Sequence, residues 1–292
     1  MQLLAYLLLY PLIWCIARLP FPMLYLLSDA TYLLVYRLIG YRKKTVRKNL
    51  ELAFPQKSTA EIIAIEKKSY RHLCDMFMEM IKTMAISRKE IDARFSYTNL
   101  EVYTELEKKG KSIAVLIPHY ASYEWVISMN HIIQFKGYAI YKRINNPYFD
   151  KMVRDIRSRF KAYLITTKET KKIIESNAKE GILGVYGFAS DQTPRWGENL
   201  YWHHFMGIET PIHIGAESLA KRYDMNMIYL RVEKVKRGYY VGTFEVLTDD
   251  VKTVPDYKIS EYFMSKVEEQ INAQPEYYMW THKRWKHKKE SI

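Results

Sequence analysis

The sequence predicts an α/β fold, built on a mixed and largely parallel central sheet that is flanked by helices. Residues 112–118 form a continuous apolar run rich in β-branched side chains, which is typical of a strand buried on both faces. Residues 182–188 form a second buried-strand pattern, directly after a segment with a helical pattern. Strands that alternate with helices in this way favour a parallel or mixed sheet.

Residues 1–41 are expected to form an apolar helical membrane anchor. Residues 1–17 carry no charge, but a helix of this length spans only about 26 Å, less than the roughly 30 Å hydrocarbon core, and Pro11 interrupts it. The apolar segment that follows contains two charged residues. The basic start and the cleavage site of a signal peptide are both missing. We therefore expect this part to enter or dip into the bilayer, and residues 42–292 to form the α/β domain.

Basic residues outnumber acidic residues by 45 to 32, which gives a formal net charge of +13. This charge indicates a polyanionic partner and is compatible with nucleic acid, an anionic membrane, an acidic carrier protein or a phosphorylated substrate. A basic cluster directly after the second apolar segment favours contact with anionic lipid on the cytoplasmic side of a membrane; the alternative is a solvated charge run. Its members are Arg42, Lys43, Lys44, Arg47 and Lys48.

Helices are predicted between this cluster and the central strand. Ser58 and Glu61 have the spacing of a capping box at the start of a long helix. Methionine and aromatic side chains recur at helical spacing along this helix, and we interpret them as residues of the hydrophobic core. Ser87 with Glu90 predicts a short helix, and residues 100–109 predict another that leads into the strand.

His119 follows the central strand and is the first candidate for catalysis. Pro118 ends the strand, so His119 lies just past its C-terminal end, where open α/β sheets place their ligands. Ser122 is a plausible N-cap for a helix over residues 123–133. Glu124, in its first turn, can then fold back onto one imidazole nitrogen and leave the other free to take a proton. The alternative is a structural histidine beside a solvated glutamate.

Polar and basic residues follow the next two strands. After a strand at 138–141 comes a basic helix with three arginines, which suit phosphate recognition unless they form only a solvated cationic face. These are Arg154, Arg157 and Arg159. The strand at 182–188 leads to Asp191 and Gln192. Beyond them, the sequence predicts a helix over 212–223, a hairpin of strands at 225–235 and 239–247, and a helix over 260–273.

No metal site or other cofactor is expected. His203 and His204 are adjacent, but no carboxylate or cysteine stands near them at ligand spacing. The two cysteines, Cys15 and Cys74, are expected to be buried free thiols in a reducing compartment.

Several motifs together resemble one enzyme family. The His119-x4-Glu124 pattern after a strand is similar to the signature of the lysophospholipid and glycerolipid acyltransferase superfamily. Four blocks within residues 41–287 resemble its late lipid A biosynthesis acyltransferases, the lauroyl/myristoyl transferases. They are the segment 41–55, the block Tyr141–Asp150 with Lys142–Arg143 in place of the family's Arg-Pro, the pair Asp191–Gln192, and Gln274–Lys286. Within the His119–Glu124 segment, Ala121 replaces a glycine of the family's pattern.

The resemblance implies a glycerolipid-acyltransferase-like fold and an acyltransferase domain over residues 42–292. It implies transfer of a fatty acyl chain from acyl carrier protein (acyl-ACP) to a hydroxyl of a lipid A precursor, at the cytoplasmic face of the inner membrane. His119 would be the general base and Glu124 would orient it, without a covalent intermediate. Substrate contacts would come from Lys142, Arg143, Arg154, Arg157, Arg159, Asp191 and Gln192. The acyl pocket would be lined by Tyr201, Trp202, Phe205 and Met206.

Two alternatives remain open at this point. One is acylation of another membrane lipid, such as a lysophospholipid or an aminolipid, by the same chemistry. The other is a non-catalytic membrane-binding protein on the same fold. No recognition motif supports a nucleic-acid partner.

Overall fold

The computed structural model describes residues 2–197 and 200–289. Its centre is a seven-stranded sheet of order β1-β9-β8-β2-β5-β3-β4, in which every neighbouring pair is parallel except β8 and β9. A separate antiparallel pair is formed by β6 and β7. The strands are β1 (Phe95–Thr98), β2 (Ile113–Ile117), β3 (Lys136–Tyr141), β4 (Tyr163–Thr166), β5 (Gly184–Ala189), β6 (Tyr201–Phe205), β7 (Ile208–Ile212), β8 (Asn226–Lys236) and β9 (Tyr239–Thr248). The predicted mixed and largely parallel sheet is confirmed, and so is the predicted hairpin, which is β8–β9.

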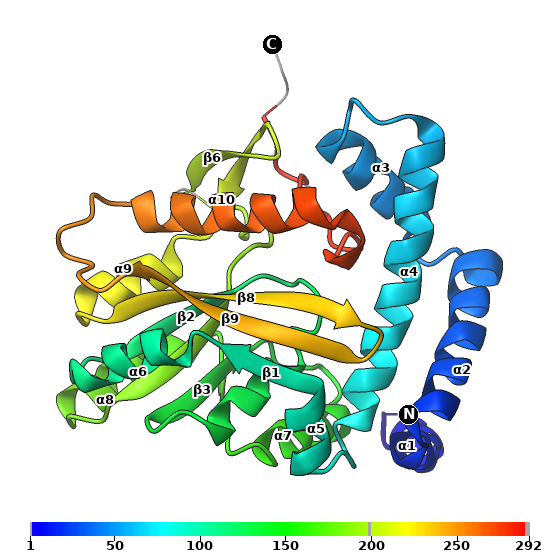
Figure 1. Ribbon diagram of the computed structural model, residues 1–292, viewed down its shortest axis with the longest axis horizontal. Coiled ribbons are helices and arrows are strands. Elements are labelled where there is room, and N and C mark those ends of the chain that lie inside the picture. The colour runs from blue at the N-terminus through cyan, green and yellow to red at the C-terminus, as the bar shows by residue number, and fades with distance from the viewer. Residues whose placement is uncertain (1, 198–199, 290–292) are drawn as a thin grey trace.

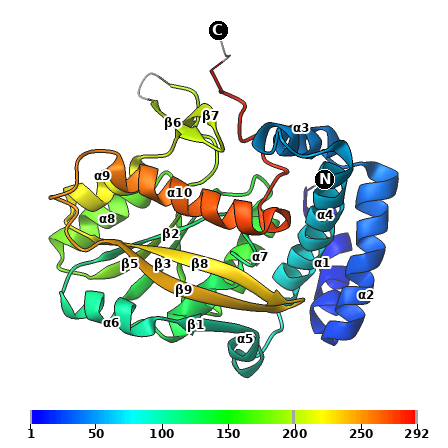
Figure 2. The same ribbon diagram turned by 45° about the horizontal axis from the view of Figure 1, so that its top comes forward.

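Helices cover both faces of the sheet and one of its ends. The α-helices are α1 (Gln2–Arg18), α2 (Phe21–Tyr32), α3 (Lys43–Ala53), α4 (Thr59–Lys82), α5 (Arg88–Arg94), α6 (Leu100–Lys108), α7 (Pro147–Ser158), α8 (Thr170–Lys179), α9 (Gly215–Arg222) and α10 (Lys258–Ala273). Shorter turns are the π-helix η1 (Leu33–Ile39) and the 3-10 helices η2 (Trp125–His131) and η3 (Pro275–Tyr277). In Figure 1, α10 lies along one face, α5 and α6 lie on the other, and α1 to α4 stand at one end. Figure 2 shows the same arrangement from a second direction.

The strand β2 lies in the middle of the sheet, between β8 and β5. Its first four residues are at most 1% exposed, which explains why residues 112–118 read as a continuous apolar run. Because β2 and β5 are parallel, and Ile117 is paired with Ala189, the segments that follow them leave the sheet at the same edge. The sheet register therefore brings His119 and Asp191 together, although 72 positions separate them in the sequence.

The long helix α4 connects the N-terminal helices to the sheet. The predicted capping box at its start is present, since Ser58 accepts a hydrogen bond from the Glu61 N–H and the Glu61 carboxylate accepts from the Ser58 N–H. Near its other end, the buried Glu79 carboxylate accepts hydrogen bonds from the hydroxyls of Tyr25 on α2 and Tyr240 on β9, each at 2.8 Å. This network joins α2, α4 and β9.

The apolar N-terminal segment is divided between the core and the surface. Phe21 and Leu24 of α2 are buried, and so is Tyr36 of η1. By contrast, Leu8 of α1 is 69% exposed and Leu38 of η1 is 80% exposed. In the part of the chain that the structure describes, no helix is both long and apolar enough to cross a membrane.

Three local predictions were wrong. The segment after β2 is the short 3-10 helix η2 rather than an α-helix over 123–133, and the Ser122 side chain does not cap it. The fully buried Trp125 donates its indole N–H to α4, which fixes this segment by tertiary contacts. Residues 208–212 form β7, so the helix predicted to begin at Ile212 starts at Gly215. Cys15 is exposed on α1, whereas Cys74 is buried as expected.

Candidate active site

His119 and Asp191 form the centre of the site. The His119 Nδ1 lies 2.7 Å from Asp191 Oδ1, and the same oxygen accepts the His119 backbone N–H at 3.1 Å. Asp191 is fully buried, while the His119 side chain is 19% exposed. Since an ionised carboxylate can only accept, Nδ1 carries a proton and Nε2 keeps a free lone pair.

The two groups stabilise each other's charged forms. Burial opposes the imidazolium, but the Asp191 carboxylate and its hydrogen bond outweigh it, so the pKa of His119 is raised. Burial likewise opposes the carboxylate, but His119 holds the pKa of Asp191 below its usual value. This is the electrostatic arrangement of a histidine base with an orienting acid.

Glu124 has a different partner from the expected one. Both of its carboxylate oxygens lie 2.9 Å from Nη2 of Arg157 on α7, and it makes no hydrogen bond to His119. The permanently charged guanidinium is a strong competitor for a carboxylate. Glu124 still contributes, after Asp191, to raising the pKa of His119.

The C-terminal segment holds the loop that carries His119. The Ala121 N–H donates to the Tyr277 carbonyl at 3.0 Å, and the Met279 N–H donates to the His119 carbonyl at 3.1 Å. Ala121 has φ of 48°, in the left-handed region, so this loop adopts the conformation that glycine takes most easily. The block 274–286 therefore supports the site although it is far away in sequence.

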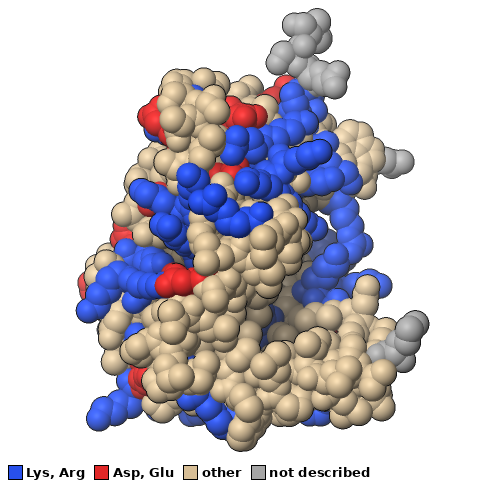
Figure 3. Space-filling model, turned by 90° about the vertical axis from the view of Figure 1, so that its right-hand side faces the viewer, with Lys and Arg blue, Asp and Glu red and all other residues tan. Residues whose placement is uncertain are grey.

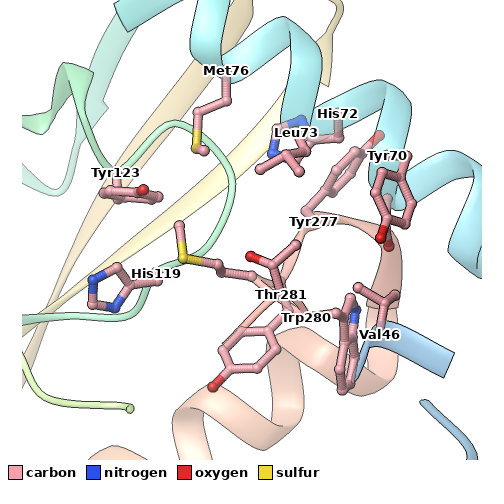
Figure 4. Close-up of a pocket in the computed structure, with 13 residues that line it drawn as sticks. Val46, Tyr70, His72, Leu73, Met76, His119, Tyr123, Tyr277, Trp280 and Thr281 are labelled. Atoms are coloured by element: carbon pink, nitrogen blue, oxygen red, sulfur yellow. The ribbon is translucent and has the colours of Figure 1, made fainter. Parts of the chain in front are cut away.

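A pocket extends from His119 between α4 and the C-terminal segment (Figure 4). In this view His119 and Tyr123 lie at one end, and Val46 and Tyr70 at the other. The Tyr123 ring packs edge-on against His119, with 5.0 Å between ring centroids. This narrow part has a volume of about 20 Å³, which is room for about one water molecule.

A wider part of about 290 Å³ adjoins the narrow one and is lined by both apolar and polar residues. The two parts share five lining residues, which are Leu73, Met76, Tyr123, Met279 and Thr281. The polar and charged residues that line the wider part include Arg42, Glu124, Gln192 and His282. The Met and aromatic stripe of α4, which the sequence analysis interprets as core, thus forms one wall of the pocket. An apolar pattern in the sequence does not distinguish a core face from a pocket wall.

The predicted basic residues occupy different environments. Lys142 and Arg143 are exposed, and Arg154 lies 3.4 Å from the buried Asp150. Arg159 donates to the carbonyls of Thr83 and Ile86, so its guanidinium connects α7 to the end of α4. Among these residues, Arg157 is the one that contacts the site, through Glu124.

The four residues predicted for the acyl pocket lie on the β6–β7 hairpin and its turn. Phe205 is fully buried against Trp285 and Tyr278, and the Tyr201 hydroxyl donates to Glu261 of α10. Trp202 packs near Lys289, and the Met206 N–H donates to Glu268. Within the described residues, none of the four lines the narrow or the wide part of the pocket.

Charge is unevenly distributed at the end of the molecule formed by α1 to α4. Figure 3 shows lysine and arginine side chains over the upper part of this end and around a hollow, whereas the lower part is largely uncharged. The predicted basic cluster contributes to this distribution, with Arg42, Lys44 and Lys48 exposed. Arg47 is instead paired with the buried Glu66 at 2.7 Å.

Comparison with known proteins gives consistent matches. A family model described as bacterial lipid A biosynthesis acyltransferase matches residues 2–287. The lipid A biosynthesis lauroyltransferase of Escherichia coli (strain K12) is 23% identical over 281 residues, which cover 96% of this chain and 90% of that protein. The myristoyltransferase of the same organism is 25% identical over 251 residues, 80% of this chain and 71% of that protein. The palmitoleoyltransferase of this organism is 24% identical over 283 residues, which cover 94% of this chain and 88% of that protein.

Proposed function

This chain belongs to the bacterial lipid A biosynthesis acyltransferase family, and we propose that it transfers a fatty acyl chain from acyl-ACP to a hydroxyl of a lipid A precursor. The observation that carries this proposal is the hydrogen-bonded pair of His119 and Asp191 at the end of a pocket with mainly apolar walls. A free imidazole nitrogen beside an apolar pocket suits removal of a proton from a hydroxyl near a bound acyl chain.

In the proposed reaction, Nε2 of His119 takes the proton of the acceptor hydroxyl as its oxygen attacks the thioester carbonyl carbon. The carbon–sulfur bond then breaks, and the imidazolium returns the proton to the leaving thiolate. Asp191 holds the ring with Nδ1 protonated and stabilises the imidazolium. The acyl group passes directly from sulfur to oxygen, without an acyl-enzyme intermediate.

Glu124 and Arg157 form the second charged pair of the proposed site. Arg157 makes two contacts with Glu124, which lines the wide part of the pocket, and a guanidinium beside this part suits a phosphate of the acceptor. The exposed Lys142, Arg143 and Arg154 extend the basic surface on which acidic carrier protein would dock. Arg159 is assigned a structural role because its contacts are to backbone carbonyls.

The acyl chain is proposed to lie between α4 and the C-terminal segment rather than on the β6–β7 hairpin. The narrow part must widen to admit a chain, and the Met76 and Met279 side chains at its junction with the wide part are flexible enough to move. Val46, Tyr70 and Trp280 at the far end would then limit the depth to which the chain enters.

Location at the cytoplasmic face of the inner membrane is supported by the N-terminal surface. Exposed apolar side chains of α1 and η1 lie in the chain directly before the exposed basic residues of the cluster. This combination suits attachment to an anionic bilayer by a surface that lies in its interface.

The test uses the purified full chain in detergent, with radiolabelled acyl-ACP and a tetra-acylated lipid A precursor. Wild type is expected to transfer the label to the precursor, and His119→Ala is expected to lose transfer by about 10²-fold or more. If wild type labels only another membrane lipid, the chemistry stands and the acceptor is wrong. If no acceptor is labelled, the catalytic proposal fails.

A further inference from the structure

The wide part of the pocket has a permanently charged cation in its wall. Among the described residues that line either part of the pocket, Arg42 is the only lysine or arginine. Glu124 lines the same wide part, but its carboxylate is already paired with Arg157. The Arg42 side chain donates to a backbone carbonyl and forms no ion pair with a described residue. The wall of the wide part therefore has an excess of positive charge, which suits an anionic group of a ligand.

Most of the Arg42 guanidinium is available to a ligand. Its Nη1 donates to the carbonyl of Thr281 at 3.0 Å, and Thr281 lines both parts of the pocket (Figure 4). A guanidinium has five N–H donors in a planar fork, so those on Nε and Nη2 remain. The oxygens of a phosphate or a carboxylate match this fork. In the proposed reaction the carboxyl group of the fatty acid is bonded to sulfur and carries no charge, so a phosphate is the matching anion.

The other polar side chains that line the wide part do not repel an anion. The Thr193 N–H donates to Nε2 of His282 at 3.2 Å, so the ring proton is on Nδ1. Burial lowers the pKa of His282 to about 4, and the ring is therefore neutral at neutral pH. Gln192 contributes a neutral amide. A phosphate in this part would meet one full positive charge, neutral polar groups and a carboxylate that is already paired.

The backbone holds Arg42 at the pocket before a ligand binds. Arg42 has φ of 52°, in the left-handed region, which costs free energy for a residue other than glycine and persists where the surroundings impose it. It directly precedes α3, and the buried Asn49 of that helix donates to the carbonyls of Trp280 and His282 at 2.8 and 2.6 Å. The start of α3 is thus joined to the C-terminal segment, and little ordering is needed when a substrate arrives.

We propose that Arg42 binds a phosphate group of a substrate in the wide part of the pocket, beside the narrow part that contains His119. This rests on the proposed acyl transfer and assigns a substrate-binding residue to it. Two substrates can supply the phosphate, namely the lipid acceptor and the phosphopantetheine arm that carries the acyl thioester. The guanidinium recognises the same chemistry in both.

The test measures kcat/KM with two pairs of substrates. The acceptor pair is the tetra-acylated precursor before and after removal of its phosphates, with acyl-ACP as donor. The donor pair is an acyl-phosphopantetheine and the acyl-pantetheine that lacks the phosphate. In one pair, wild type is expected to use the phosphorylated member about 10-fold better or more, and Arg42→Gln should lose this preference through a higher KM. The pair in which the preference disappears identifies the source of the phosphate.

Arg71→Gln is the matched control, because Arg71 is an exposed arginine of α4 that lines neither part of the pocket. It should keep the wild-type preference. If Arg42→Gln does not fold, as judged by thermal unfolding, Arg42→Lys replaces it and should lose part of the preference, since lysine keeps the charge without the fork.

Two results would overturn the inference and leave acyl transfer intact. One is equal use of both members of each pair by wild type. The other is an equal loss by Arg42→Gln with phosphorylated and dephosphorylated substrates, which would make Arg42 a structural contact to Thr281. If neither short donor is used, the acceptor pair decides. If wild type acylates no acceptor with acyl-ACP, the proposed function fails as well.

Discussion

At His119, one buried carboxylate oxygen accepts both the backbone N–H and the ring Nδ1–H. This double contact fixes the position of the loop and the tautomer of the ring at the same time. An amide at position 191 could present its N–H₂ group to Nδ1 and favour the tautomer that has no lone pair on Nε2. The catalytic competence of His119 is therefore expected to depend on the charge of Asp191 as well as on its shape.

Asp191→Asn is accordingly expected to lower kcat by about 10²- to 10⁴-fold. Glu124→Gln is the comparison, because the Glu124 carboxylate contacts Arg157 and not the imidazole. We expect it to reduce kcat less than Asp191→Asn does. Steady-state kinetics with acyl-ACP measure both. The reverse order would mean that Glu124 becomes the partner of His119 once substrate is bound.

The dependence of activity on pH follows from the same pair. In the proposed mechanism His119 is a general base, which works only when deprotonated, and its pKa is raised above its usual 6.5. Activity should therefore fall as pH decreases, with the acid limb of kcat/KM above pH 6.5. In Asp191→Asn, no carboxylate at this position offsets the effect of burial, so the pKa of His119 should be lower. The acid limb of the residual activity should therefore move to lower pH. An acid limb at the same pH in both proteins would show that Asp191 is not the group that raises the pKa of His119.

At the scale of elements, α4 has two roles, because one of its faces lines the pocket while Glu79 joins α2 and β9 to it. Burial raises the pKa of Glu79 to about 7, although the hydroxyls of Tyr25 and Tyr240 favour its ionised form. The carboxylate thus takes up its charge near neutral pH, within the contact between the N-terminal helices and the sheet.

This contact should make stability depend on pH. Between the ordinary pKa of 4.5 and about 7, the folded protein holds the Glu79 proton and the unfolded chain releases it. The free energy of unfolding should therefore fall by roughly 1–3 kcal/mol from pH 5 to pH 7. Glu79→Gln, which does not titrate, should flatten this slope even if its overall stability is lower. Denaturant unfolding across this range measures both slopes, and identical slopes would contradict the assignment.

Most elements were predictable because local patterns agree with the tertiary fold. The apolar run of β2, the capping box of α4 and the β8–β9 hairpin all appear where the sequence places them. The failures are segments whose conformation is set by partners outside the segment itself. Trp125 is fixed by α4, and β7 exists because it pairs with β6. Neither partner can be identified from periodicity within the segment itself.

For the whole molecule, the sequence predicts the edge of the sheet at which the candidate site lies. It does not predict which side chains contact each other there. Parallel strands imply that His119 and Asp191 leave the sheet together, but their hydrogen bond depends on loop geometry. The contact of Glu124 with Arg157 depends on how α7 packs, which no spacing specifies. The pocket is likewise formed by α4 and the C-terminal segment, which contact each other only in the folded protein.

Large apolar side chains of α1 and η1 are exposed in the part of the chain that the structure describes. Leu4 and Leu8 of α1, and Leu38 and Ile39 of η1, are each more than 60% exposed. Large apolar side chains that are exposed repeatedly along a helix indicate an interaction surface. The exposed basic residues at the start of α3 follow directly in the chain, which matches an anionic lipid bilayer better than an uncharged partner.

We therefore expect the full chain to bind phosphatidylglycerol vesicles, with affinity that decreases but does not vanish as salt increases, because the apolar contribution is not screened. The double substitution Leu4→Glu and Leu8→Glu should weaken binding by 10-fold or more, roughly what the loss of two apolar contacts implies. Tyr262→Glu, at an exposed aromatic residue on α10, is the matched control and should bind like wild type. Co-sedimentation at low and high salt measures all three proteins. Unchanged binding by the double variant would show that the vesicle contact lies elsewhere, and the exposed face of α1 would then need a protein partner.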